Sequence, residues 1–121
     1  MSTAFSLSEE ELDDHRHVIA VTGEVDLFTA PQLKSALHGA IAAGKRGVVV
    51  DLSETSFIDS TALGVLIGAL RRLREGDGLL VLVNGNESIS RTLEITGLDR
   101  IFAIVDTREE AIAALEAPSA A

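Results

Sequence analysis

The sequence contains no cysteine, tryptophan or tyrosine, and phenylalanine occurs four times. Without cysteine the chain can form neither a disulfide framework nor a thiolate site for metal or redox chemistry. Aromatic residues make up 3% of the 121 residues and apolar residues 46%, so the core must consist of aliphatic side chains. A chain of this length is expected to form one domain, residues 1–121, with a loose tail at Ala117–Ala121.

Long apolar runs and an excess of basic charge are missing as well. No run approaches the roughly 20 apolar residues that a membrane-spanning helix needs. The segment Met1–Ser8 lacks the basic and apolar parts of a signal peptide, so we expect a cytoplasmic chain that does not bind membranes. The net charge of −9 leaves no basic footprint for phosphate groups, which argues against a nucleic-acid partner.

The apolar pattern predicts a starting β-hairpin followed by alternating helices and strands. The hairpin strands are expected at Ala4–Leu7 and His17–Val21. We place a solvated hairpin tip at the acidic residues Glu9–Glu11, Asp13 and Asp14. Short apolar runs, typical of buried strands, follow at Val48–Leu52, Leu79–Val83 and Ile101–Val105.

Apolar residues at helical spacing predict four amphipathic helices. They extend from a Thr29 cap to Gly44, from Leu63 to Gly76, around Ile89 and Leu93 up to Gly97, and from a Thr107 cap to Leu115. Because parallel strands need helical crossovers, this order predicts an α/β sandwich. Its centre is a mixed β-sheet, with about four helices packed on it.

Binding sites in such sheets gather beyond the carboxyl ends of the strands. Three segments are expected there, Gly23–Asp26, Asp51–Ser53 and Phe57–Gly64. In the last, Asp59 or Ser60 is a good helix N-cap, so an ordinary capping role is one interpretation.

Two glycines in the helix that follows favour a second interpretation. Gly64 and Gly68 each cost about 1 kcal/mol relative to alanine in a helix interior. They indicate either tight packing of this helix on the sheet or the close approach of a partner.

Three motifs occur along the chain, Phe57–Gly64, Gly23–Asp26 with Thr29–Pro31, and Ile95–Leu98. The first resembles the phosphorylation motif of bacterial anti-sigma factor antagonists, which are stand-alone STAS domains. The other two resemble further signatures of that family, and all three occur in the family's order over nearly the whole chain. One position departs, because Ala62 stands where many members carry glycine. We expect this methyl group to affect partner fit rather than phosphorylation.

The resemblance implies a partner-switching protein rather than an enzyme. Its partner would be an anti-sigma factor with serine/threonine kinase activity, which the unphosphorylated chain binds, freeing the sigma factor. Phosphorylation of Ser60, whose neighbouring hydroxyl is Thr61, would release the chain, and a separate phosphatase would reset it. The implied partner-binding residues are Glu24, Asp26, Asp59, Ser60, Thr61, Ala62, Leu63 and Gly64. No cofactor or metal is implied, and we expect a monomer or a weak dimer.

Other interpretations stay open at this point. A phosphoaspartate receiver would use Asp51, but the acidic pair for Mg²⁺ and the lysine after the last strand are missing. An enzyme would use Ser60, which lacks the Gly-x-Ser-x-Gly elbow. A metal pair at His15 and His17 is conceivable, although we expect exposed histidines there, and His38 falls among the polar positions of its helix. A STAS-type module could also dock in another signalling complex or sense a small ligand.

Overall fold

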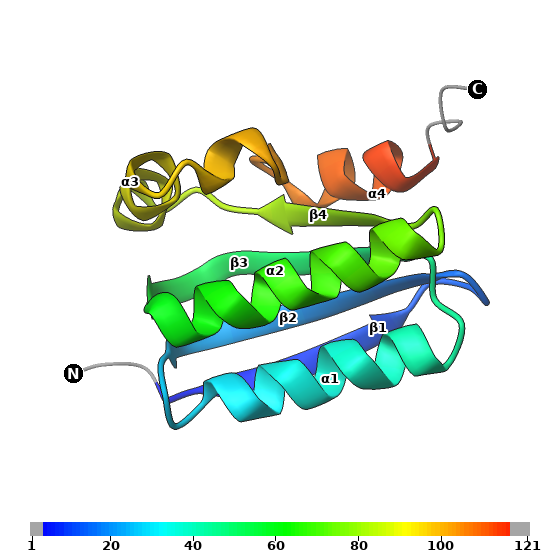
Figure 1. Cartoon of the computed structure of the whole chain (residues 1–121), viewed down its shortest axis with the longest axis horizontal. Coiled ribbons are helices and arrows are strands. Elements are labelled where there is room, and N and C mark those ends of the chain that lie inside the picture. The colour runs from blue at the N-terminus through cyan, green and yellow to red at the C-terminus, as the bar shows by residue number, and fades with distance from the viewer. Residues whose placement is uncertain (1–3, 117–121) are drawn as a thin grey trace.

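A computed structural model describes residues 4–116, so the predicted tail at Ala117–Ala121 lies outside the described residues. Five strands form one sheet in the order β1-β2-β3-β4-β5, and only the β1–β2 pair is antiparallel (Figure 1). The strands are β1 Ser6–Glu11, β2 Arg16–Val25, β3 Gly47–Ile58, β4 Leu79–Val83 and β5 Ala103–Val105. The parallel strands therefore end at one edge of the sheet, which we call the carboxyl edge.

Helices cover both faces of this sheet. They are α1 Ala30–Ala42, α2 Ser60–Glu75, α3 Glu87–Ile95 and α4 Arg108–Glu116, with a 3-10 turn η1 at Leu98–Arg100. Helices α1 and α2 lie side by side across one face (Figure 1), and α3 adds Ile89 and Leu93 to the core beneath them. Helix α4 covers β3, β4 and β5 on the other face.

The two faces of the sheet follow from the alternation of side chains along each strand. On β3, Val48 and Val50 belong to the core under α1 and α2, whereas Val49 belongs to the smaller core under α4. The predicted α/β sandwich, with a mixed sheet and four α-helices, is confirmed. Among residues 4–116, no helix is long and apolar enough to cross a membrane.

The predicted hairpin tip is wrong in part. Glu9, Glu10 and Glu11 lie within β1, paired opposite β2, and the turn spans residues 12–15. Each of the three glutamates is paired with a cation or a histidine from elsewhere in the fold. Lys45 and Arg108, which are distant in sequence, offset the charge of two glutamates in this strand.

Strand β3 is longer than the apolar run that predicted it. It continues from Leu52 through mostly exposed residues to Ile58, in parallel pairing with β2. Asp51 therefore lies in the middle of a strand and not at its end. The prediction that Asp51–Ser53 is one of the three segments at the carboxyl edge is wrong. Strand β5 is shorter than predicted because Gly97, at φ 76°, turns the chain into η1 before the strand begins.

Candidate functional site

Three loops at the carboxyl edge are each closed by an aspartate or asparagine side chain. Asp26 Oδ1 accepts hydrogen bonds from the backbone N–H groups of Phe28 (2.9 Å) and Thr29 (3.1 Å) before α1. Asp59 Oδ1 accepts from Ala62 N at 3.0 Å before α2. Asn86 Oδ1 accepts from the first turn of α3, at 2.7 Å for Ser88 N. The edge is therefore built from short, hydrogen-bonded turns, and sequence analysis missed its third turn, at Asn86.

Ser60 is the first residue of α2, and it is exposed. The sequence left open whether Asp59 or Ser60 caps this helix, and the structure assigns the cap to the Asp59 carboxylate. The backbone N–H of Asp59 also donates to Val25 O at 3.1 Å, which ties the start of α2 to the end of β2. The Ser60 hydroxyl thus projects from a rigid position without serving as the cap.

Gly64 and Gly68 line a groove beside Ser60. The groove lies between α1 and α2, encloses about 390 Å³, and is lined by Lys34, His38, Thr61, Gly64, Val65, Gly68 and Arg72. A Cβ built on Gly64 or Gly68 meets no atom within 4 Å beyond the helix backbone and the adjoining residues. Tight packing on the sheet, one of the two predicted reasons for these glycines, is therefore wrong. The open backbone leaves room for the close approach of another molecule.

The other predicted contact residues fall into two groups. Glu24 is exposed, Asp26 and Thr61 are half-buried, and Asp26 is engaged in its own turn. Ala62 is fully buried and Leu63 is 7% exposed, because both face the core under α2. The prediction that Ala62 and Leu63 contact a partner is therefore wrong, because their side chains form part of the core and are not available on this surface.

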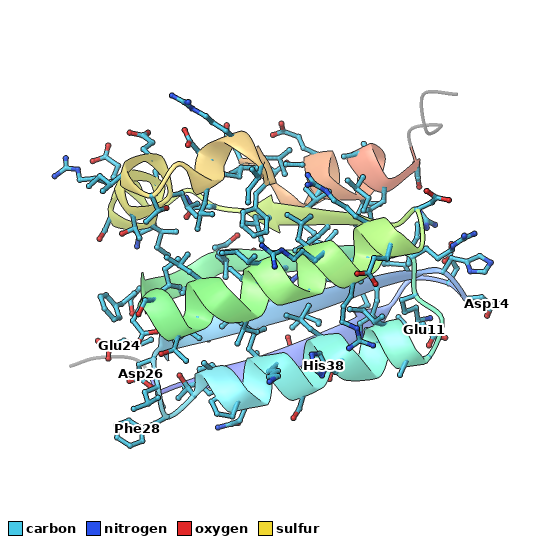
Figure 2. All side chains as sticks on the ribbon, in the orientation of Figure 1. Glu11, Asp14, Glu24, Asp26, Phe28 and His38 are labelled. Atoms are coloured by element: carbon cyan, nitrogen blue, oxygen red, sulfur yellow. The ribbon has the colours of Figure 1, made fainter. Side chains whose placement is uncertain are left out.

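Three large apolar residues lie exposed at this edge, and sequence analysis missed two of them, Leu27 and Phe28. The third, Phe57, begins one of the predicted segments of the edge. Leu27 is 63% exposed and Phe28 83%, both in the turn between β2 and α1, and Phe57 lies exposed at the end of β3. Figure 2 shows Phe28 near Glu24 and Asp26 at this end of the molecule. One signal in the sequence was available, since Leu27 and Phe28 stand between the turn-forming residues Asp26 and Thr29.

Asp51, the acceptor of the receiver interpretation, is engaged in a different role. Its Oδ2 lies 3.0 Å from Arg108 Nη2 of α4, and its Oδ1 accepts from Ser53 N at 2.9 Å. Burial acts to raise the pKa of Asp51, but the hydrogen bonds from Ser53 and Arg108 outweigh it and hold the pKa below its ordinary value. A buried carboxylate with both oxygens engaged is poorly placed to accept a phosphoryl group.

The histidines do not form a metal pair. His15 lies in the hairpin turn, whereas His17 lies in β2 with its Nε2 2.8 Å from Glu9 Oε1. The expectation of exposed histidines is wrong for His17, which is buried, and His38 is exposed on α1 as predicted. Within residues 4–116, no three histidine or acidic side chains are grouped as metal ligands.

The fold and this edge can now be compared with known proteins. The family model of the STAS domain matches residues 8–111. The chain belongs to the STAS domain family. This bears out the resemblance of the three motifs. The glycines of the two companion STAS motifs, Gly23 and Gly97, both have a positive φ, which side chains rarely tolerate.

Two similar proteins are named anti-sigma-B factor antagonists. The chain is 39% identical over 113 residues to the anti-sigma-B factor antagonist of Listeria monocytogenes, covering 91% of this chain and 95% of that one. It is 33% identical over 101 residues to the protein of the same name from Staphylococcus aureus, covering 84% and 94%. Both alignments span nearly the whole STAS domain.

Solved structures of two similar proteins have the same fold. An anti-sigma factor antagonist from Mycobacterium paratuberculosis superposes with a TM-score of 0.85 at 29% identity, covering 93% of this chain and 95% of that one. The Bacillus cell fate determinant SpoIIAA, in its phosphorylated form, superposes with a TM-score of 0.70 at 26% identity, covering 92% and 98%. This STAS fold has thus been seen in a relative that carries a phosphate.

Proposed function

We propose that this STAS protein is an anti-sigma factor antagonist that is switched by phosphorylation of Ser60. In its unphosphorylated form it binds an anti-sigma factor with serine/threonine kinase activity, which frees the sigma factor. The kinase then phosphorylates Ser60, the complex separates, and a phosphatase restores the serine. The observation that carries this proposal is the exposed hydroxyl of Ser60 on a helix that Asp59 already caps.

Thr61 is the less suitable acceptor of the two neighbouring hydroxyls. It is half-buried and faces the groove between α1 and α2, whereas Ser60 is exposed. A kinase must bring its nucleotide in line with the acceptor oxygen, and an exposed side chain allows this without unfolding the first turn of α2. Thr61 then serves as a contact residue, together with Gly64.

The phosphate acts on the interface rather than on the fold. A phosphoserine adds about −1.5 to −2 charges, and the N-terminus of a helix tolerates this charge because of its free N–H groups and its dipole. Asp59 and Glu24 already make this edge acidic, so a partner that fits it closely must accept further negative charge and bulk. Such like-charge and steric conflicts cost several kcal/mol, which corresponds to about a hundredfold or more in affinity.

The test mixes the purified protein with candidate kinase-type anti-sigma factors and ATP and follows its intact mass. We expect one added phosphate on the wild type and on Ser56→Ala, a control at an exposed serine of β3, and none on Ser60→Ala. Phosphorylated protein should bind the kinase at least about a hundredfold more weakly than Ser60→Ala.

Two results would contradict the proposal. A phosphate that persists in Ser60→Ala would place the acceptor elsewhere. Equal binding of phosphorylated and unphosphorylated protein would remove the switch and favour the alternative of a docking or ligand-sensing STAS module.

A further inference from the structure

The turn between β2 and α1 exposes two large apolar side chains in a chain that has few large aromatic ones. Phe28 is 83% exposed and Leu27 63%, whereas Phe102, for example, is 5% exposed. An exposed apolar pair is stabilised when a partner buries it, and buried aromatic residues are common energetic centres of protein interfaces.

The turn that carries the pair is held rigidly. Asp26 Oδ1 accepts from the N–H groups of Phe28 and Thr29, and Asp26 N donates to Thr29 Oγ1 at 2.9 Å. The backbone N–H of Ala30 donates to Asp26 O at 2.7 Å. Thr29 is the N-cap of α1 as predicted, but its hydroxyl makes no capping bond to the helix and serves the turn instead. Because the backbone is fixed before binding, little conformational freedom remains to be lost there.

The turn between β2 and α1 lies next to the start of α2, because the strands that precede the two are paired in the sheet. Val25 pairs with Ile58 in the sheet, and Val25 O accepts the hydrogen bond from Asp59 N, one residue before Ser60. Phe57 is paired with Glu24 on the adjoining strand. A partner large enough to contact Ser60 therefore also reaches the Leu27–Phe28 turn.

The charges around the pair define the chemistry of its partner. Figure 2 shows Glu24 and Asp26 near Phe28, and Glu24 is exposed. The Asp59 carboxylate closes the adjoining turn before α2. Among residues 4–116, no ion pair to these three carboxylates was found. The complementary surface is an apolar pocket with lysine or arginine at its rim.

We propose that Leu27 and Phe28 form an apolar anchor, which inserts into such a pocket on the protein that phosphorylates Ser60. This inference rests on the proposed function. The anchor supplies affinity in both phosphorylation states, whereas Ser60 supplies the switch. The two contributions come from different turns, so they can be changed separately.

The experiment measures the affinity of the kinase-type anti-sigma factor for variants made in a Ser60→Ala background, which holds the chain unphosphorylated. We expect Phe28→Ala to weaken binding about tenfold to a hundredfold, and Leu27→Ala about tenfold. Phe28→Tyr keeps the ring and should bind nearly as well as the parent. The matched control is Ile95→Ala, because Ile95 is also an exposed apolar residue, 78% exposed at the end of α3. The affinity of the kinase-type anti-sigma factor for this variant should not change.

Two further measurements test whether the variants keep their stability and their response to phosphorylation. The variants should keep the denaturant midpoint of the parent, since both side chains lie mostly in solvent. With serine restored at position 60, phosphorylation should weaken binding by the same factor in Phe28→Ala as in the wild type, as expected for independent contacts.

The outcomes separate this inference from the proposed function. If the wild type is bound and phosphorylated but Phe28→Ala and Leu27→Ala bind equally well, the anchor is overturned and the function stands. If Phe28→Ala instead abolishes a concentration-dependent dimer seen by sedimentation and leaves kinase binding unchanged, the pocket belongs to a second copy of this chain. If no kinase-type anti-sigma factor binds the wild type, both proposals fall together.

Discussion

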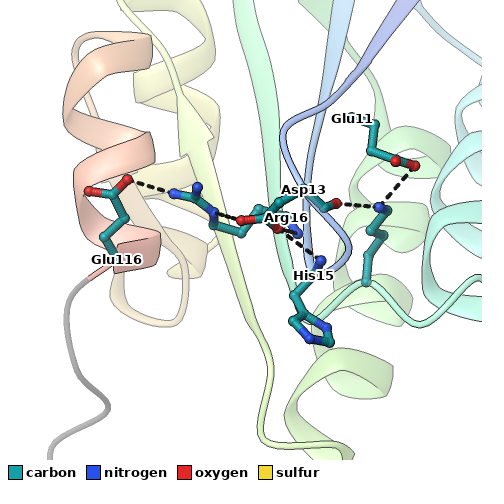
Figure 3. A network of polar contacts seen from close by, with 6 residues as sticks. Glu11, Asp13, His15, Arg16 and Glu116 are labelled. Atoms are coloured by element: carbon teal, nitrogen blue, oxygen red, sulfur yellow. Dashed lines mark hydrogen bonds and ion pairs between the residues drawn. The ribbon is translucent and has the colours of Figure 1, made fainter.

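At the hairpin end of the sheet several acidic side chains pair with cations, and Asp13 closes a backbone turn as well. At the carboxyl edge the Asp26 and Asp59 carboxylates close turns and form no ion pair among residues 4–116. Figure 3 shows the hairpin network, in which Arg16 lies 2.7 Å from Asp13 and 2.6 Å from Glu116, while Glu11 lies 3.0 Å from the Lys45 ammonium. These contacts join the hairpin to α4 and to the loop before β3. Charge is used here to hold distant segments of one chain together.

The carboxyl edge keeps a different set of groups free. Its aspartates bind N–H groups of their own turns, and Leu27, Phe28 and the open backbone of Gly64 face solvent. A region built only for stability would bury the apolar residues and use alanine in the helix. The contrast supports the proposal that one end of the sheet stabilises the chain and that the other end binds a second molecule.

The largest effect on this contrast is expected from Arg108→Ala. Removing the guanidinium leaves Asp51 buried without its cation, so the free energy of unfolding should fall by about 2 kcal/mol. Chemical denaturation measures the change. Glu24→Gln, a charge removed at the carboxyl edge, is the control and should change stability by less than about 0.5 kcal/mol. Equal losses in both variants would erase the contrast.

Asp59→Ala removes the cap of α2 and should cost about 1 kcal/mol of unfolding free energy. Ser60→Ala is the matched variant one residue later, and it should leave the unfolding midpoint nearly unchanged because Ser60 does not cap. A larger loss in Ser60→Ala than in Asp59→Ala would show that the hydroxyl has a structural role.

Gly64→Ala should separate stability from binding. Alanine favours the helix by roughly 0.8–1 kcal/mol, and the site is open, so the free energy of unfolding should rise. The added methyl group occupies part of the groove between α1 and α2, so affinity for the kinase-type anti-sigma factor should fall. Gly39→Ala on α1, also in open space, is the control that should gain stability without losing affinity. Unchanged affinity in Gly64→Ala would remove the groove from the interface.

Acid should act first on the hairpin end and on α4. Hydrogen bonds from Arg16 and from the backbone of His15 lower the pKa of Asp13 to about 2, and the pKa of Asp51 is lowered as well. A carboxyl whose pKa is lower in the folded state stabilises the fold above its ordinary pKa, near 3.8, and loses that effect as pH falls toward the folded value. Hydrogen exchange between pH 5 and pH 2.5 should therefore show graded loosening of α4 and the hairpin. Unchanged protection of both elements over this pH range would contradict the assignment.

The smallest effect is expected from Glu116→Gln. Its contact with Arg16 is solvent-exposed, and exposed pairs contribute about 0.2–1 kcal/mol, so the unfolding midpoint should move only slightly. The shift should vanish in 1 M salt, where charges are screened within about 3 Å. A shift that persists in salt would mean that packing, and not charge, holds the end of α4.

The sequence was sufficient for the sandwich because its buried strands are short apolar runs and its helices have apolar residues at helical spacing. It failed at Glu9–Glu11, which lie in a strand and not in the hairpin tip. Lys45 and Arg108, both distant in sequence, pair with Glu11 and Glu10, and His17 of the neighbouring strand pairs with Glu9. None of these pairs can be inferred from an acidic run alone.

The candidate site was predictable in outline through its motifs. Ser60 and Glu24 lie exposed at the edge where the motifs place them. The apolar spacing that begins at Leu63 already indicates that Leu63 faces the core, whereas nothing in the motif separates Ala62 from Gly64 beforehand. The exposure of Phe28 was indicated only by the turn-forming residues Asp26 and Thr29 on either side, and an apolar residue in a sequence most often belongs to the core.

The carboxylate of Asp59, and not the hydroxyl of Ser60, closes the first turn of α2. A side chain at such a position can be altered chemically, restored and altered again while the cap of the helix stays the same. Under the proposed function the chain would carry a mark that is written and erased repeatedly, and the mark would act only on contacts with another protein.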